Sequence, residues 1–154
     1  MLTIIQDSSD PIGLFRGWLT EAEAAEPDVP NAMCLATVSA HGKPSARMVL
    51  LKDVGAQGFV FYTNAESRKG MEIARNPFAS LCFHWKTLGR QVRIEGRLSK
   101  VSAAEADAYW NSRPRESQIN GCASQQSRPV ASRAALQAEQ DRLTAQFAGQ
   151  PVPR

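Results

Sequence analysis

Motifs that mark the commonest catalytic centres are missing from this sequence. It has no glycine-rich phosphate loop of the GxGxxG type, and its only histidines are His41 and His84. No Cys/His cluster has the spacing of zinc ligands, and no Ser-His-Asp set is evident. The sequence therefore argues against a hydrolase or a metalloenzyme, and we expect no metal site.

Cysteines and long apolar runs are also scarce. The three cysteines, Cys34, Cys82 and Cys122, lie far apart and form no CxxC pair, which is a poor basis for a disulfide framework. Cys34 and Cys82 stand in apolar runs typical of buried thiols, so we expect a reducing, cytoplasmic location. No apolar run reaches membrane-spanning length, and no basic start of a signal peptide is present. We expect no membrane association.

The overall composition indicates one folded domain. A chain of 154 residues, 43% hydrophobic and 21% charged, suits a single domain over residues 1–154 with one sizeable core. Residues 1–9 are expected to be flexible. The formal net charge of +3 is compatible with an anionic small ligand or with nucleic acid. Because the aromatic residues stand mainly in core-like positions rather than among lysines, we expect no nucleic-acid binding.

Hydrophobic periodicity and turn signals predict antiparallel strands with peripheral helices. Strands are expected over Ala32–Ser39, Ser45–Asp53, Phe59–Asn64, Phe78–Trp85 and Gln91–Ser99. Helices are expected over residues 11–25, 68–75, 102–112 and 131–148, with a capping box at Ser102 and Glu105. Residues 113–130 are polar and are expected to be irregular. The predicted fold class is mainly β with α (α+β), and strands joined by tight turns favour a barrel.

The first candidate binding segment is Ser67-Arg68-Lys69, at a predicted helix start. Free backbone N–H groups, the positive end of the helix dipole and two cationic side chains coincide there, which indicates a phosphate site. Cations in a first helical turn oppose the dipole unless an anion offsets them. The alternative is a solvated basic turn, and the local sequence does not decide between the two.

The second candidate is the apolar strand Arg47-Met48-Val49-Leu50-Leu51-Lys52, with a cation at each end. Strict alternation places Arg47 and Lys52 on opposite faces of a strand. They reach one ligand only if a bulge or a strand end intervenes. The alternative is a core strand flanked by surface charges.

Two polar segments complete the set of candidates. Tyr109 and Arg113 share one face of a predicted helix. That helix is expected to end at Arg113, before Pro114. With Ser117 they offer a phenol, a guanidinium and a hydroxyl for a second phosphate, although the local sequence alone favours a surface cap. The segment 125–129 lies in a long polar stretch, and such loops in compact domains are either functional or disordered.

Together these segments resemble the pyridoxamine 5'-phosphate oxidases, the FMN-dependent enzymes of vitamin B6 metabolism. The resemblance runs from about Asp10 to the C-terminus. It rests on six stretches in the family's order and at close to its spacing: ATVSAHGKPSARMVLLK, GFVFYTNAESRKG, NPFASLCFHW, RQVRIEGRLSKVS, YWNSRPRESQI and ASQQS. It implies an antiparallel split β-barrel of the FMN-binding type, and a homodimer with FMN bound between the protomers.

The resemblance also implies a role for each candidate residue. FMN would be contacted by Arg47, Met48, Val49, Leu50, Leu51, Lys52, Tyr62, Thr63, Arg68, Lys69, Gln91, Gln126 and Ser127. The last two of these would be reached from the second protomer. The substrate phosphate would be held by Lys52, Tyr109, Arg113 and Ser117, so that Lys52 lies between flavin and substrate.

The reaction that the resemblance implies is the oxidation of pyridoxamine or pyridoxine 5'-phosphate to pyridoxal 5'-phosphate. A hydride leaves the C4' carbon for the flavin N5, and dioxygen reoxidises the flavin and yields hydrogen peroxide. Because the flavin performs the difficult step, the protein needs neither a nucleophile nor a metal. This agrees with the missing motifs, and no residue is assigned as catalytic.

The sequence departs from the family at both ends. Family members continue beyond Pro151-Val152-Pro153 with a Trp-containing strand and an Arg-x-His motif, and they carry a basic segment before the position of Asp10. This sequence has neither. Two alternatives to the oxidase therefore stay open. One is a non-catalytic module that binds FMN or pyridoxal phosphate, and the other is a related flavin oxidase with a different substrate, such as a phenazine precursor.

Overall fold

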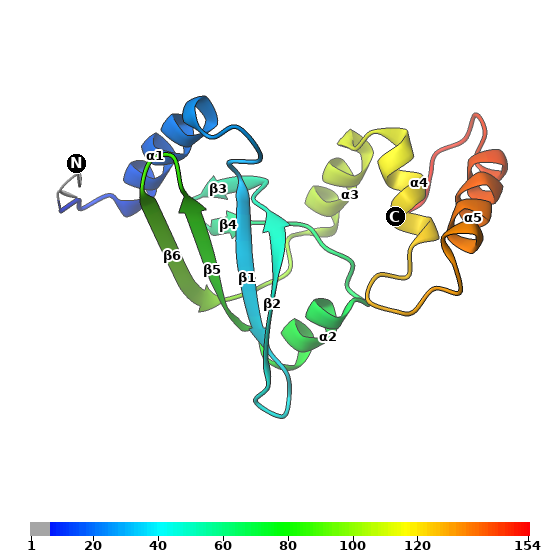
Figure 1. Ribbon diagram of the computed structural model, residues 1–154, viewed down its shortest axis with the longest axis horizontal. Coiled ribbons are helices and arrows are strands. Elements are labelled where there is room, and N and C mark those ends of the chain that lie inside the picture. The colour runs from blue at the N-terminus through cyan, green and yellow to red at the C-terminus, as the bar shows by residue number, and fades with distance from the viewer. Residues whose placement is uncertain (1–6) are drawn as a thin grey trace. The chain divides into compact units, whose positions relative to one another are not determined.

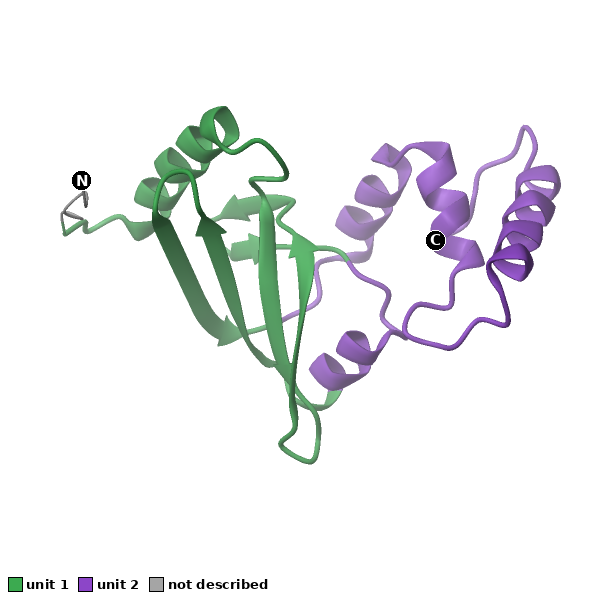
Figure 2. Ribbon diagram, viewed as in Figure 1, with its two compact units in different colours: residues 1–62, 75–98 green, residues 63–74, 99–154 purple. Residues whose placement is uncertain are grey.

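A computed structural model describes residues 7–154, which form two compact units (Figures 1 and 2). The first unit comprises the chain up to Tyr62 together with Arg75–Leu98, and the second comprises Thr63–Ala74 and Ser99–Arg154. A single domain over residues 1–154 stays a prediction. The predicted flexibility of residues 1–9 falls largely on residues 1–6, which lie outside the described part.

The first unit contains both sheets. Its elements are α1 (Pro11–Ala25), β1 (Ala32–Val38), β2 (Pro44–Leu50), β3 (Asp53–Gly55), β4 (Gly58–Val60), β5 (Phe78–Trp85) and β6 (Arg90–Arg97). Four strands form an antiparallel sheet in the order β2-β1-β5-β6, and β3 pairs with β4 in a separate antiparallel hairpin (Figure 1). The predicted antiparallel α+β class is confirmed.

Helix α1 supplies the aromatic centre of this unit's core. It begins as the sequence predicts, because Asp10 Oδ1 accepts a hydrogen bond from the Gly13 N–H at 2.8 Å. The Phe15 ring centroid lies 4.8 Å from that of Phe59 and 5.1 Å from that of Phe83. The helix therefore packs against both the four-stranded sheet and the β3–β4 hairpin.

The second unit contains the remaining helices, except for the last residue of α2: α2 (Arg68–Arg75), α3 (Ala103–Ser112), α4 (Arg115–Ala123) and α5 (Arg133–Gln146). Its core consists of the buried side chains of Ile119, Leu143 and Val152, with Trp110 and Phe147 packed against them. The indole N–H of Trp110 donates to the carbonyl of Val152 at 2.8 Å. The last residues of the chain are therefore held against α3 and α4.

Two strands end at least three residues earlier than the sequence predicts. β2 stops at Leu50 rather than Asp53, and β4 stops at Val60 rather than Asn64. Pairing explains the end of β4, because Asp53 opposite Val60 is the last pair of the hairpin. Beyond β2, the backbone N–H of Leu51 bonds to Asn31 outside β1, at 2.9 Å.

The prediction that residues 113–130 are irregular is wrong over half of its length, because α4 occupies Arg115–Ala123. The segment has no helical apolar stripe, and Asn120-Gly121 is a turn signal. Tertiary contacts stabilise this helix instead: Ile119 is buried in the core, and the Gln118 amide donates to the Trp110 carbonyl at 2.8 Å. Such contacts routinely override weak local propensity.

Candidate functional sites at the start of α2 and along β2

The start of α2 is organised by the hydroxyl of Ser67, which is fully buried. Its Oγ donates to the carbonyl of Asn64 at 2.7 Å and accepts from the Gly70 N–H at 3.3 Å and from Lys69 Nζ at 3.1 Å. The hydroxyl therefore caps the helix and also positions a cation. The cap confirms the helix start that the sequence predicts at Ser67.

Lys69 points inward rather than into solvent, and only 7% of the residue is exposed. Its ammonium also donates to Oε1 of Gln126 at 2.6 Å. A buried ammonium is costly unless polar groups surround it, and Ser67 and Gln126 provide two of them. The interpretation of this segment as a solvated basic turn does not apply to Lys69.

Arg68 lies beside Lys69 but is directed differently. Its side chain is 60% exposed, and its Nε donates to Oε1 of Glu72 at 2.9 Å. Glu72 is one turn later on α2 and is 6% exposed. The sequence interpretation missed Glu72, although the i,i+4 spacing to Arg68 was a signal that could have indicated it.

Gly70 allows the loop before α2 to pass close to the helix. A Cβ added at this position would lie 2.2 Å from the carbonyl oxygen of Ala65. The obstacle is backbone, which cannot move aside as a side chain can. Glycine is therefore required for the close approach that brings Ser67 over the helix end.

The loop between α4 and α5 contacts this region through Gln126 and Arg128. Besides the bond from Gln126 to Lys69, Arg128 Nη2 lies 3.6 Å from Oε2 of Glu66. Between them, Ser127 has φ 72°, in the left-handed region that non-glycine residues seldom adopt. Backbone of this kind clusters at functional sites. Gln126 thus contacts Lys69 of its own chain, and its assignment to a second protomer's site stays a prediction.

In the first unit, Arg47 is held by a network on the core-facing side of β2. It stands opposite Leu35 of β1, and its guanidinium donates to the Leu35 carbonyl at 3.0 Å and to Thr37 Oγ1 at 2.6 Å. It also donates to Ser45 Oγ at 2.5 Å. Ser45 lies two residues before Arg47 on the same face, a spacing that could have identified it.

Lys52 follows the end of β2 and its side chain is exposed. Its backbone N–H donates to Val60 O at 2.8 Å, while the neighbouring Leu51 is buried and its carbonyl accepts from the Asn31 amide at 2.9 Å. The strand end anticipated between Arg47 and Lys52 is therefore present. Alternation along β2 does not extend to Lys52.

The other predicted residues of the first unit differ in exposure. Val49 faces the core side with Arg47, whereas Met48 and Leu50 face away and are 62% and 40% exposed. Tyr62 is half-buried just after β4, and Gln91 is exposed on β6 opposite His84. Thr63, the first residue of the second unit, is exposed.

Three of the four residues predicted to hold the substrate phosphate lie at the junction of α3 and α4, and the fourth, Lys52, lies in the first unit. Tyr109 is in the last turn of α3, Arg113 is the residue that ends this helix, and Ser117 is in the first turn of α4; all three are half-buried. The Arg113 guanidinium carbon lies 5.1 Å from the centre of the Trp110 ring. A guanidinium that lies over an aromatic ring can still donate hydrogen bonds to a ligand from its N–H groups.

The thiol of Cys122 is not activated for nucleophilic chemistry. Burial raises its pKa, and the nearby charge of Arg113 only partly opposes this effect, so the thiol stays protonated at neutral pH. Within residues 7–154 no group of three or more His, Cys, Asp or Glu side chains could hold a metal ion. No helix in that range is long and apolar enough to cross a membrane.

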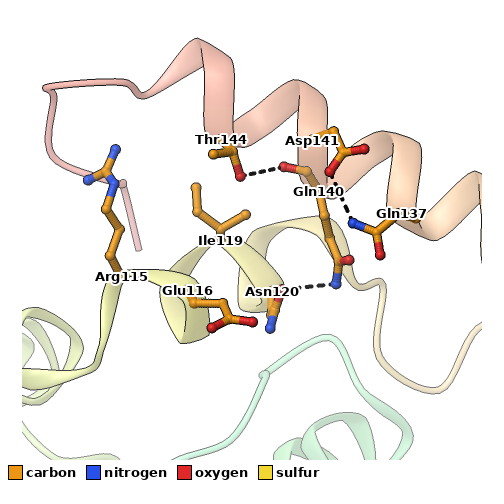
Figure 3. A pocket seen from close by; sticks show the side chains of 8 residues that line it. All are labelled: Arg115, Glu116, Ile119, Asn120, Gln137, Gln140, Asp141 and Thr144. Atoms are coloured by element: carbon orange, nitrogen blue, oxygen red, sulfur yellow. Dashed lines mark hydrogen bonds between the residues drawn. The ribbon is translucent and has the colours of Figure 1, made fainter.

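A groove of about 300 Å³ lies between α4 and α5 (Figure 3). Its lining includes Asn120, Gln137, Gln140 and Asp141, whose polar groups bond to one another: Gln140 Nε2 to Asn120 Oδ1 at 2.9 Å, and Gln137 Nε2 to Asp141 Oδ1 at 3.0 Å. None of the residues predicted to bind cofactor or substrate lines this groove. We assign it no role in the site.

Comparison with known proteins shows where this arrangement belongs. A family model described as pyridoxamine 5'-phosphate oxidase matches residues 19–147. A pyridoxine/pyridoxamine 5'-phosphate oxidase of Sphingopyxis alaskensis is 56% identical over 147 residues, covering 96% of this chain and 68% of the relative. The corresponding protein of Brucella anthropi is 57% identical over 148 residues, covering 96% of this chain and 73% of the relative.

The chain belongs to the pyridoxamine 5'-phosphate oxidase family. Its fold is the split barrel of that family. The crystal structure of PhzG from Burkholderia lata 383, in complex with tetrahydrophenazine-1-carboxylic acid, superposes with a TM-score of 0.89 at 32% identity and covers 97% of this chain and 73% of that one. An FMN-binding protein of Nostoc punctiforme shares the fold, with a TM-score of 0.67 at 17% identity over 86% of this chain and 73% of that one.

The start of α2 in this family member has donors of the kind that a flavin phosphate requires. Arg68, Lys69 and the free N–H groups of the first turn combine two cations with the positive end of a helix. No acidic residue stands in that first turn. Glycine at position 70 allows the loop to lie against the helix. These residues fit a phosphate monoester.

Proposed function

We propose that this protein oxidises pyridoxamine 5'-phosphate and pyridoxine 5'-phosphate to pyridoxal 5'-phosphate, with FMN as cofactor and dioxygen as acceptor. Membership of the oxidase family, with identity of 56% over 96% of the chain, is the observation that carries this proposal. The buried Lys69 beside Arg68 supports FMN, because both residues lie at a helix start suited to a phosphate.

The cofactor residues proposed from the resemblance perform two tasks. Arg68 and Lys69 hold the phosphate of FMN by charge-assisted hydrogen bonds, while Ser67 and Gln126 fix the direction of the Lys69 ammonium. The remaining proposed contacts, which bind the ring, the ribityl chain and the phosphate, are Arg47, Met48, Val49, Leu50, Leu51, Lys52, Tyr62, Thr63, Gln91 and Ser127. Arg47 is suited to this because three acceptors hold its guanidinium in one position.

Lys52, Tyr109, Arg113 and Ser117 are proposed to hold the phosphate of the substrate. A fixed remote phosphate orients the carbon that reacts and converts binding energy into positioning. FMN, when bound, accepts a hydride and passes the electrons to dioxygen, which leaves as hydrogen peroxide. The chain's contribution is thus binding and orientation.

Two measurements test this proposal. Purified protein reconstituted with FMN should keep the visible absorption of a bound flavin through gel filtration. It should then convert pyridoxamine 5'-phosphate to pyridoxal 5'-phosphate with equimolar hydrogen peroxide. Flavin retention without product would instead favour a binding module for FMN or pyridoxal phosphate, and loss of flavin would refute cofactor binding.

A related flavin oxidase with another substrate is the second candidate, because a solved structure with a phenazine compound superposes at a TM-score of 0.89. The identity to that protein is 32%, against 56% for the B6 phosphate oxidase of Sphingopyxis alaskensis, so we favour the B6 phosphates. Competition decides between the two: turnover of a reduced phenazine carboxylate that is insensitive to pyridoxamine 5'-phosphate would support the second candidate.

The cofactor-phosphate assignment is tested by Arg68→Ala. Loss of one charge-assisted contact is expected to weaken FMN binding by at least about tenfold and to leave riboflavin, which has no phosphate, almost unaffected. Arg75→Ala provides the control, because it removes the same charge at the other end of α2. Dissociation constants from quenching of flavin fluorescence give the comparison. Equal FMN affinity in the two variants would remove Arg68 from the site.

We also propose that the protein acts as a homodimer in the cytoplasm. The outward face of the sheet carries exposed apolar side chains, including Met48 and Phe78, which a second copy would cover. All three cysteines are unpaired, as in reducing compartments.

A further inference from the structure

Glu72 is a buried carboxylate that neither the resemblance nor the comparisons assign to a role. It lies on α2, is 6% exposed, and accepts a hydrogen bond from Arg68 Nε at 2.9 Å. Burying a carboxylate is costly unless it is paired. A buried carboxylate that is paired in this way is therefore a candidate for a positioning role.

The order of the pair along the helix is unfavourable for a purely stabilising ion pair. Arg68 stands in the first turn and Glu72 follows four residues later. A carboxylate near the N-terminus and a cation near the C-terminus is the arrangement that the helix dipole favours. The reverse order, found here, places the cation of Arg68 at the positive end of the helix dipole, where an anion is stabilised instead. A cation in this position is suited to a helix start that binds phosphate.

The contact with Glu72 leaves the outer edge of the guanidinium available. Arginine offers five N–H donors in a planar fork, and Glu72 takes the one on Nε. Glu72 supplies the only hydrogen bond that this side chain makes to any residue of the described part, 7–154, and the side chain is 60% exposed. The terminal nitrogens can therefore meet a ligand at the same helix start as Lys69.

We propose that Glu72 is a positioning residue for phosphate binding: by holding Nε, it fixes the Arg68 guanidinium with its terminal N–H groups directed at the phosphate of the flavin. This inference rests on the proposed function. An unheld arginine side chain loses rotamer entropy when it binds, and the contact with Glu72 removes that cost in advance.

A positioning role and a simple electrostatic role for Glu72 predict changes of opposite sign in FMN affinity when Glu72 is removed. Removing a negative charge beside an anion site should strengthen FMN binding if Glu72 were merely a counter-charge. If it positions Arg68, Glu72→Ala should weaken FMN binding by about tenfold, with riboflavin affinity unchanged. Glu72→Gln keeps an oxygen that can accept from Nε, and its FMN affinity should stay within about threefold of the wild type.

The experiment measures the dissociation constants of FMN and riboflavin for wild type, Glu72→Ala and Glu72→Gln, with thermal unfolding as a check on folding. If the alanine variant does not fold, Glu72→Met fills the space without an acceptor and replaces it. Repeating Glu72→Ala in an Arg68→Ala background closes a double-mutant cycle, in which the second substitution should have no further effect.

Four results would overturn the inference: tighter or unchanged FMN binding by Glu72→Ala, equal weakening of FMN and riboflavin, a glutamine variant as weak as the alanine variant, or a persistent effect without Arg68. Failure of the wild-type protein to bind FMN would refute the proposed function instead. The two failures are therefore distinguishable.

Discussion

Arg113 combines a packing contact with a proposed binding role. Its guanidinium lies over the Trp110 ring, and a Cβ added at Gly121 would be 3.3 Å from its Nη1. Gly121, which has no side chain, leaves room for the guanidinium in this position. Preorganised guanidinium groups are suited to bidentate phosphate contacts.

We predict that Arg113→Ala raises the KM for pyridoxamine 5'-phosphate by at least about tenfold, because a charged hydrogen-bond donor is lost, and leaves FMN affinity unchanged. Arg113→Lys should recover only part of the loss, since lysine lacks the planar fork. Steady-state kinetics and FMN titration give the two readouts. A large loss of flavin affinity would mean that the two phosphates are assigned the wrong way round.

Among the elements, α2 depends on close backbone contact more than on helix propensity. Ser67 caps it, and Gly70 lets Ala65 approach. Glycine within a helix costs about 1 kcal/mol relative to alanine. Glycine is nevertheless required at position 70, because the loop before the helix occupies the space that a side chain would need.

We predict that Gly70→Ala lowers the free energy of unfolding by roughly 1–3 kcal/mol, because the new Cβ would overlap the carbonyl of Ala65. FMN affinity should fall with it, since Ser67 and Lys69 would shift. Gly17→Ala in α1 is the matched control: nothing lies within 4 Å of its added Cβ, so it should be neutral or stabilising by up to about 1 kcal/mol. Denaturant unfolding measures both, and equal effects would exclude a steric role for Gly70.

Helix α3 shows a titratable cap. Ser102 Oγ and its backbone N–H both donate to Glu105 Oε2, at 2.7 and 3.0 Å. The side-chain bond first, and then the backbone bond, hold the pKa of Glu105 below its ordinary value. A carboxyl group with a lowered pKa in the folded state stabilises the protein above its ordinary pKa, and this stabilisation is lost as pH falls through the lowered value.

We therefore predict that Glu105→Gln lowers Tm at neutral pH and that the difference from wild type disappears in acid, below the lowered pKa of Glu105. Calorimetric scans over an acid pH series measure the difference. Ser102→Ala removes both the cap and the donor hydroxyl, and in that background the pH-dependent part of the effect should shrink. A difference that stays constant with pH would contradict the cap as its source.

At the scale of the whole molecule, the sheet of the first unit has an outward face with apolar residues and small side chains. The pairing of β2, β1 and β5 places Met48, Cys34 and Cys82 in one row on that face. Phe78 lies on the same face and is 58% exposed. Exposed apolar surfaces of this kind commonly mark protein–protein interfaces.

We predict a dimer in solution, with a mass in light scattering of twice the 16.8 kDa of one chain. Phe78→Asp should shift the protein toward the single-chain mass, because a charge would be buried in the interface. Val130→Asp is the control, since Val130 is equally exposed, at 58%, on the second unit. A single-chain mass for the wild type, or dissociation of both variants, would refute this interface.

Sequence alone was sufficient for features governed by local chemistry. The helix start at Ser67 and the capping box of α3 follow from side chains within three residues of the helix end. The alternation along β6 is confirmed, with Gln91 and Arg93 exposed and Val92 and Ile94 half-buried. The family, too, was recognisable from short ordered stretches of residues.

Tertiary structure decided what depends on partners distant in the chain. Helix α4 is stabilised because Ile119 packs in a core with Leu143 and Val152. No local sequence pattern indicates that Ile119 is buried. Lys69 is buried because Gln126, 57 positions away, accepts its hydrogen bond. The spacing of Glu72 from Arg68 indicates an ion pair, but its burial depends on the packed surroundings, and burial sets the cost of a desolvated charge.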